Sequence, residues 1–421
     1  MLAKRLRSCS CIFIYSALIF SVLWRGSDVA WRLSVLQTLV FLSFFFYSAS
    51  SLLTGRSIWA ETPLIKPLIV CGMIVFVSGL TAENMGLAFQ ALLQLLSCAA
   101  AFFVCMGIAV QRDEQRRMLT IVSGTTLGLC GFGLLIHFKI FLFPSWELIH
   151  AYQHGNLSAT FINHCHMAGW LEMAILLFIP LLFIRQKKPA MVGLLLCGLA
   201  VMMVSLILTL SRGGWFSSAV GLCFLTGVIF FHDSFRLPKR YFFVFLTIFF
   251  AAVFFILGNN AVTKRSLTVI EQDTSSALSG RTIAWEGTID MIKAYPLTGV
   301  GPGNYATAFT RFQPPGSGGR FFKAHNDYLE FIAEAGLFLL PSMIWLIVVF
   351  FKKGFQNLKH PSRQTRWITL GAMGGILSIL VHSLSDFNLQ IPSNALLFCF
   401  LAAQVAAPAP ALKKKSLGYR L

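Results

Sequence analysis

Residues 189–231 read PAMVGLLLCGLAVMMVSLILTLSRGGWFSSAVGLCFLTGVIFF, which is two long apolar runs separated by the short polar segment TLSRGG. About 20 apolar residues are the length that an α-helix needs to cross the hydrocarbon core of a bilayer. A helix also satisfies its own backbone hydrogen bonds, as lipid requires. The stretch therefore predicts two membrane-spanning helices, over residues 190–210 and 214–231, joined by a turn that contains Arg212.

The same pattern recurs along all 421 residues, of which 56% are hydrophobic and only 12% charged. Soluble domains carry about 25% charged residues, so this composition excludes a soluble protein. We expect an all-α, polytopic membrane helix bundle with twelve spans. They cover residues 11–24, 34–53, 64–80, 87–110, 119–143, 167–184, 190–210, 214–231, 241–258, 329–351, 366–386 and 391–407.

The positions of the basic residues predict the orientation of the bundle, because Lys and Arg near span ends are retained in the cytoplasm. With the N-terminus inside, 23 of the 34 Lys and Arg fall on the cytoplasmic side, 10 fall outside and Lys139 lies within a span. Both termini are then cytoplasmic, and the first apolar run is a retained span rather than a cleaved signal. Seven of the ten outward cations lie in one loop, residues 259–328.

This pattern divides the chain into four parts. Residues 1–258 hold nine spans, residues 259–328 form the long outward loop, residues 329–407 hold three spans, and residues 408–421 form a cytoplasmic tail. The net charge of +18 lies mostly in short cytoplasmic turns, where it suits anionic lipid. We therefore expect membrane lipid and no nucleic acid as a partner. The ten cysteines lie mostly in apolar runs and show no metal pattern, so no cofactor is predicted.

The long outward loop contains the stretch SGRTIAWEGTIDMIKAYP, which predicts a helix over residues 281–294, capped by Ser279 and ended by Pro296. Its apolar stripe should be Ile283, Trp285, Ile289 and Ile292. The following segments, LTGVGPGNY and FQPPGSGGR, are rich in turn residues, and we expect them to form a mobile strap over the bundle. GVGPG lacks the strand, helix and acidic residue of a dinucleotide-binding turn.

Three residues are candidates for catalysis. Arg212 lies at the membrane boundary, where a guanidinium costs about 2.5 to 3.5 kcal/mol and so calls for a partner or a function, although snorkelling to headgroups is an alternative. Arg281 begins the loop helix and has donors suited to a phosphate, although a loop arginine is usually a solvated charge. His325, in KAHNDYLEFIAEAGL, is placed to act as a general base, or simply caps the next span.

Further polar residues should face the same outer rim. Those expected to bind substrate are Asn163, His164, Glu172, Asn326, Asp327 and Asp386. Asn326 or Asp327 can also cap the tenth span, and Glu172 or Asp386 can pair with Arg212 or orient His325. Polar contact between helices is the alternative for this set. A zinc site at His164 and His166 is disfavoured, because side chains two residues apart on a helix diverge.

Four segments together resemble the O-antigen ligase and polymerase superfamily of bacterial membrane glycosyltransferases. They are SRGGW, SGRTIAWEGTIDMIKAYPLTGVGPGNY, AHNDYLEFIAEAGL and HSLSDFNLQIPSNA, and the resemblance covers residues 155–400. It implies a lipid-linked glycosyltransferase-type fold in the inner membrane that moves a glycan from undecaprenyl diphosphate to a sugar hydroxyl at the periplasmic face. Arg212, Arg281 and His325 match the family's functional set.

The acceptor is the part that the resemblance leaves open. A ligase would use lipid A core, a polymerase a second carrier-linked glycan, and a protein O-oligosaccharyltransferase a Ser or Thr; we place ligase first and polymerase second. A transporter or carrier-lipid flippase would also have twelve spans, but should show matching halves with broken helices near the midplane, which this sequence lacks. A non-catalytic membrane scaffold is a further alternative, and the oligomeric state is open.

Overall fold

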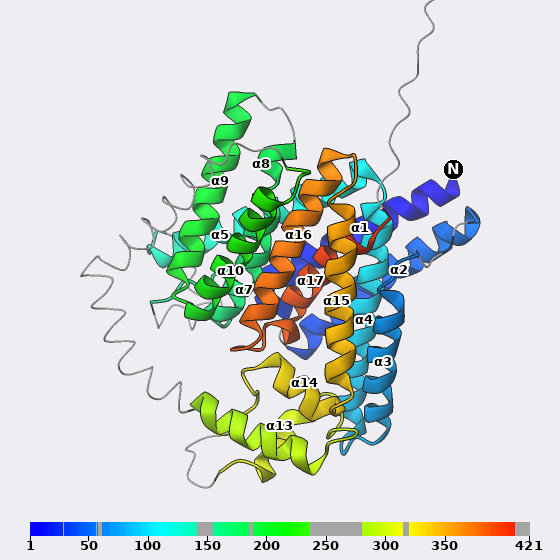
Figure 1. Cartoon of the computed structure of the whole chain (residues 1–421), viewed down its shortest axis with the longest axis vertical. Coiled ribbons are helices and arrows are strands. Elements are labelled where there is room, and N and C mark those ends of the chain that lie inside the picture. The colour runs from blue at the N-terminus through cyan, green and yellow to red at the C-terminus, as the bar shows by residue number, and fades with distance from the viewer. Residues whose placement is uncertain are drawn as a thin grey trace, which may run out of the picture.

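The computed structural model describes residues 1–27, 29–55, 57, 61–140, 155–184, 188–235, 280–314 and 320–408. Within these residues all regular secondary structure is helical, and eight helices are long and apolar enough to cross a membrane. The protein is therefore a multi-pass membrane protein (Figure 1). The eight are α1 (Leu2–Leu23), α2 (Ala30–Leu53), α4 (Met85–Ala109), α5 (Arg112–His137), α7 (His164–Phe178) with α8 (Leu181–Ile184), α9 (Pro189–Leu208), α10 (Arg212–Phe231) and α15 (Leu339–Asn357).

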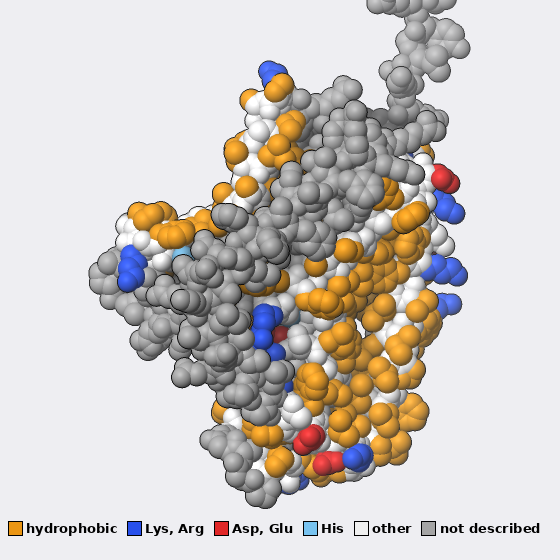
Figure 2. All heavy atoms as spheres, turned by 60° about the vertical axis from the view of Figure 1, so that its left-hand side comes forward, with side chains coloured by type: hydrophobic (Ala, Val, Ile, Leu, Met, Phe, Trp, Pro, Cys, Tyr) orange, Lys and Arg blue, Asp and Glu red, His pale blue; other side chains and the backbone are white. Residues whose placement is uncertain are grey.

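Three further long helices lie where the sequence predicts spans. They are α3 (Ile65–Leu80), α16 (Arg363–His382) and α17 (Pro392–Ala406). The ninth expected span, residues 241–258, lies outside the described residues, as does most of the expected tail, so the full count of twelve stays a prediction. Exposed side chains on α3 and α15, such as Phe76 and Ile344, are hydrophobic, and Figure 2 shows a broad hydrophobic area on the surface, as expected for a face in lipid.

The expected tenth span, 329–351, is wrong at its start. Gly336, with φ 87°, separates the nine-residue helix α14 (Asp327–Ala335) from α15, so only the second helix is long enough to cross the bilayer. A side chain at Gly336 would place its Cβ 2.0 Å from Leu297 O. The chain turns here because glycine alone tolerates both the positive φ and this close approach.

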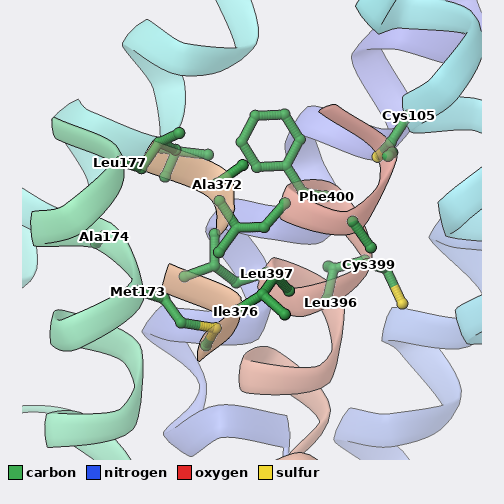
Figure 3. Packing of buried hydrophobic residues seen from close by; sticks show 14 of the residues in the cluster. Cys105, Met173, Ala174, Leu177, Ala372, Ile376, Leu396, Leu397, Cys399 and Phe400 are labelled. Atoms are coloured by element: carbon green, nitrogen blue, oxygen red, sulfur yellow. The ribbon is translucent and has the colours of Figure 1, made fainter. Parts of the chain in front are cut away.

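The centre of the bundle is α7, packed between α10, α16 and α17. Figure 3 shows Met173 and Leu177 of α7 facing Ala372 and Ile376 of α16, with Phe400 of α17 beside them. Glycines let the backbones come close: a Cβ on Gly375 would lie 3.1 Å from Met173 O. Small residues of this kind favour helix association in lipid, where burial of apolar surface contributes little.

Below the bundle in Figure 1, a second hydrophobic cluster joins the helix over residues 280–294 with α13 (Tyr305–Ala308), η2 (Phe309–Arg311) and α14. The helix over residues 280–294 confirms the predicted one, while Ser279 lies outside the described residues. The predicted stripe is wrong at Ile289, whereas Ile292 packs against the cluster as expected. Ala284, Thr288 and Met291 are the buried face and Ile289 is exposed, because Gly287 lets Phe309 come within contact distance of the helix.

The GVGPG segment, residues 299–303, is packed in place, so the expectation of a mobile strap is wrong for this half of the loop. Val300 N and Gly301 N donate to Ala333 O and Glu334 O, which are among the last carbonyls of α14. The fully buried Asn304 side chain then accepts from Asn84 N at the start of α4. The glycine-rich segment thus caps α14 and ties it to the α3–α4 turn. The second half, FQPPGSGGR, lies partly outside the described residues.

Candidate active site

Arg212 is the first residue of α10, and its side chain is exposed. Ser211 caps the helix by accepting from Gly214 N at 3.2 Å, and Leu210 before it has φ 55°, a conformation that non-glycine residues rarely adopt. The cap fixes where the chain turns into α10 and so where the guanidinium projects. The helix N-terminus adds free amides and a positive partial charge beside that guanidinium, a combination that attracts anions.

The two glycines of SRGGW lie against buried side chains. A Cβ on Gly213 would lie 2.9 Å from His382 Nε2, and a Cβ on Gly214 would lie 2.6 Å from Ala168 Cβ. His382 is 1% exposed, and its Nδ1 lies 3.3 Å from a carboxylate oxygen of Glu172, which also accepts from Ser217. Glu172 therefore pairs with His382 and not with Arg212 or His325.

His325 pairs instead with Asp386. Its Nδ1 lies 3.5 Å from Asp386 Oδ1, its side chain is 36% exposed, and its own φ is 50°. Burial alone would raise the pKa of Asp386, but the contact with His325 and the fields of His166 and His382 hold it well below its usual range. An ionised Asp386 only accepts, so it suits a proton on the Nδ1 that faces it, while Nε2 stays outside this contact.

Cys165 links these groups to Arg281. The Cys165 thiol, at the start of α7, lies beside Ser211 and Asp386 and within the electrostatic reach of Arg281. Three segments therefore lie together at one end of the bundle, namely the starts of α7 and α10 and the turn after α16, and the start of the helix over residues 280–294 is a fourth segment within electrostatic reach of them. Arg212, Arg281 and His325 each belong to, or contact, one of these segments, although 113 residues separate Arg212 from His325 along the chain.

The other residues that the sequence singled out lie around this end of the bundle. Asn163 caps α7 by accepting from Cys165 N, and His164 contacts Asn156. Asn326 caps α14, and the buried Asp327 accepts from Leu389 N and from the Gln390 amide. These side chains have protein partners that hold the site's segments in place, and a substrate contact for them stays a prediction.

Lys323 and Glu330 form a further pair at this site, which the sequence did not predict. Lys323 Nζ lies 2.8 Å from the fully buried Glu330 carboxylate, and it also donates to Gln390 and lies 5.9 Å from the centre of the Phe387 ring. Burial opposes its charge, but Glu330 and Glu334 outweigh that effect and raise the pKa of Lys323. The sequence feature that could have indicated this pair is a lysine and a glutamate seven residues apart, one on each side of His325.

In chemical terms, this end of the bundle offers two guanidinium groups and one partly exposed imidazole backed by a carboxylate. Figure 2 shows basic side chains next to an acidic one on one face of the molecule, with hydrophobic side chains nearby. Cations at the membrane boundary favour an anionic ligand that has an apolar part. Among the described residues, no group of three or more His, Cys, Asp or Glu side chains converges as a possible metal site.

Comparison with known proteins adds one match. No curated protein matches the chain. The family model described as O-antigen ligase matches residues 197–344, a segment that contains Arg212, Arg281 and His325. It runs from α9 through the outward loop to the first residues of α15, and so includes α10 and α14. The resemblance seen in the sequence is thereby confirmed: residues 197–344 match the O-antigen ligase family.

Proposed function

We propose that this protein is a membrane glycosyltransferase that transfers a glycan from undecaprenyl diphosphate to a sugar hydroxyl of lipid A core at the periplasmic face of the inner membrane. The observation that carries the proposal is the His325–Asp386 pair, held at the end of the bundle where Arg212 and Arg281 also lie. The family match supports a lipid-linked glycan as substrate.

The two arginines would bind the diphosphate of the donor. Negative charge develops on the leaving diphosphate as its bond to the anomeric carbon breaks, and fixed cations stabilise that charge most where water is scarce. Guanidinium groups bind phosphate oxygens in a bidentate manner, and the amides at the start of α10 add to the Arg212 contact. These groups supply the charge without a metal ion.

His325 would activate the acceptor. Its Nε2 takes the proton of the acceptor hydroxyl as the hydroxyl oxygen bonds to the anomeric carbon, and the bond from that carbon to the diphosphate oxygen breaks. Undecaprenyl diphosphate leaves with the bonding electrons, and the proton passes from His325 to water. A single displacement of this kind inverts the anomeric centre.

Reconstitution of the purified protein would test the proposal. The donor is an undecaprenyl diphosphate glycan, and the acceptor is either core lipid or a second molecule of carrier-linked glycan. One discrete addition to core lipid supports a ligase, whereas a ladder of products on the carrier would show a polymerase of the same family. Movement of the donor across the vesicle membrane without transfer would contradict both and favour a transporter.

Single substitutions would test the assigned roles in the same assay. We expect Arg212→Ala, Arg281→Ala and His325→Ala each to lower transfer by at least about a hundredfold at normal expression. Matched controls are Arg311→Ala, which removes an exposed ion pair with Glu83, and His360→Ala in the α15–α16 turn, and both should retain activity. Near wild-type transfer by the Arg212 or His325 variant would remove that residue from the mechanism.

A further inference from the structure

The backbone of Ala324, the residue just before His325, is held by side chains at both its N–H and its C=O group. Glu330 accepts from Ala324 N at 2.8 Å with one carboxylate oxygen and binds Lys323 with the other. On the opposite side, Trp285 Nε1 donates to Ala324 O at 3.0 Å. Ala324 itself is fully buried. Both hydrogen-bonding groups of this residue are therefore satisfied by side chains rather than by regular secondary structure.

This arrangement matters because His325 has a backbone conformation that it would not adopt freely. Its φ of 50° is unfavourable for a non-glycine residue, so surrounding contacts must impose it. After His325, Asn326 caps α14 and Asp327 N donates to Ser383 O in the turn that carries Asp386. The chain is thus fixed immediately before and after His325, and the ring is directed at Asp386.

Trp285 also belongs to the helix that begins near Arg281. The two residues are four apart, so they lie on neighbouring turns of one face of that helix. The helix is seated on Phe309 through Gly287 and through the buried Met291. A shift of the helix would therefore move Arg281 and release Ala324 together.

We propose that Trp285 and Glu330 are positioning residues that clamp the Ala324 peptide, and that Trp285 couples the placement of His325 to that of Arg281. This inference rests on the proposed function, because it assigns the clamp a role in the step that His325 performs. Neither side chain touches the reacting groups in this role. The clamp acts on turnover by holding the base and one donor-binding cation in a fixed relative position.

Kinetics of full-length variants would test the clamp. Trp285→Phe keeps the ring and removes the indole N–H, and we expect kcat to fall about tenfold, with KM for donor and acceptor within about twofold of wild type. The matched control is Tyr305→Phe, which also keeps its ring and removes one hydrogen-bonding group, the hydroxyl that contacts Thr288, in the same buried cluster. Equal kcat losses in the two variants at equal thermal stability would show a merely structural role and overturn the proposal. Unchanged kcat in Trp285→Phe would do the same.

Two further comparisons sharpen the test. Glu330→Gln, combined with Lys323→Met to avoid a stranded charge, keeps an acceptor for Ala324 N and should retain most of the kcat that Glu330→Ala loses. The double variant Trp285→Phe with Asp386→Asn should lose less kcat than the product of the two single fold-losses, because both substitutions act through the orientation of His325. A loss of kcat equal to that product would overturn the clamp. If His325→Ala were fully active, the proposed function itself would be overturned. If His325→Ala were inactive but Trp285→Phe had the kcat of wild type, only the clamp would be contradicted.

Discussion

At the scale of single residues, the site contains two histidine–carboxylate pairs with different surroundings. His382 and Glu172 are almost fully buried, whereas His325 is about one-third exposed beside its buried partner Asp386. Only the exposed imidazole is accessible to a substrate. The buried pair lies under the glycines of SRGGW and supports the turn that carries Arg212.

The first prediction concerns Asp386. Asp386→Asn keeps the shape of the side chain but removes its charge and allows the amide to donate, so the His325 tautomer is no longer fixed. We expect kcat for glycan transfer to fall about 10- to 100-fold while the affinity for the donor is unchanged, as measured by steady-state transfer and donor binding. Loss of donor binding with unchanged kcat would place Asp386 in the donor site instead.

The second prediction concerns Glu172. Glu172→Gln removes one partner of a fully buried pair, and such a loss costs about 3 to 5 kcal/mol when the other charge stays buried. We expect a clear drop in the thermal unfolding midpoint of the detergent-purified protein. Asp386→Asn, with its histidine open to solvent, serves as the control and should lower the midpoint less. A larger drop for the Asp386 variant would contradict this division of roles.

At the scale of the elements, the short helix α14 is held in place by glycine-rich backbone. The segment over residues 299–303 caps its last carbonyls, and Gly336 ends it. Because the first residues of α14 follow His325 directly, the position of this helix determines where the base lies. The glycines of GVGPG are therefore needed for close backbone packing. Their composition had suggested a mobile segment instead.

The third prediction tests this packing with alanine substitutions. Gly336→Ala forces a positive φ on alanine and places its Cβ 2.0 Å from Leu297 O, so we expect lower stability and faster proteolysis of the outward segments. Gly193→Ala is a matched control, since that helical position in α9 faces open space, and it should be neutral or slightly stabilising. Equal behaviour of the two variants would refute the packing role of Gly336.

At the scale of the whole molecule, the contacts between helix ends fit a chain that crosses the membrane back and forth. Ends that should lie on the same side of the membrane are in contact with each other. Gly26, between α1 and α2, lies against Ser393 at the start of α17, at the end of the bundle that holds the candidate site. At the other end, Gln115 of α5 contacts Gln404 of α17 and Gln364 of α16. The assignment of these two ends to periplasm and cytoplasm rests on the distribution of basic residues.

The fourth prediction concerns that assignment. Cysteines introduced at the exposed positions Lys293 and Lys359 should react differently with a membrane-impermeant maleimide in intact cells, in a background without the native cysteines. We expect labelling at residue 293 and none at residue 359 until the membrane is opened, because the positive-inside distribution places residue 359 in the cytoplasm. The reverse pattern would invert the proposed topology and contradict a periplasmic site.

The fifth prediction concerns pH. Burial raises the pKa of Asp327 to about 7, and burial together with Glu330 raises the pKa of Glu334 to about 7; both lie in α14, which is too short to span the membrane. At these two carboxyls the folded state therefore holds more protons than the unfolded chain between about pH 4 and 7, so their contribution to stability should rise as pH falls through 7. The low pKa of Asp386 opposes this only below about pH 4, where unfolded Asp residues take up protons.

Thermal unfolding of the purified protein at pH 8, 6.5 and 5 would measure this dependence. The midpoint should be highest at pH 5, and the dependence should shrink in Glu334→Gln and in Asp327→Asn. Lys293→Gln, which removes an exposed ion pair with Asp290, should leave the pH dependence of the midpoint unchanged. A midpoint that rises with pH would show that the two carboxyls are ionised in the folded state.

The sequence by itself determined the class of this protein, the approximate places of its spans, the helix over residues 280–294, and the three residues to which a role in glycan transfer is assigned here. These features depend on properties of the local chain, namely apolar length, charge beside a span and short motifs. The match over residues 197–344 agrees with the family resemblance, and the roles of the three residues stay a proposal.

Only the tertiary structure decided which groups are partners. It paired Glu172 with His382 and Asp386 with His325, turned GVGPG into the cap of α14, ended that helix at Gly336, and replaced the expected apolar stripe by Ala284, Thr288 and Met291. The physical reason is that each of these outcomes depends on close packing between segments far apart in the chain. Composition and periodicity describe one segment at a time and carry no information on what faces it.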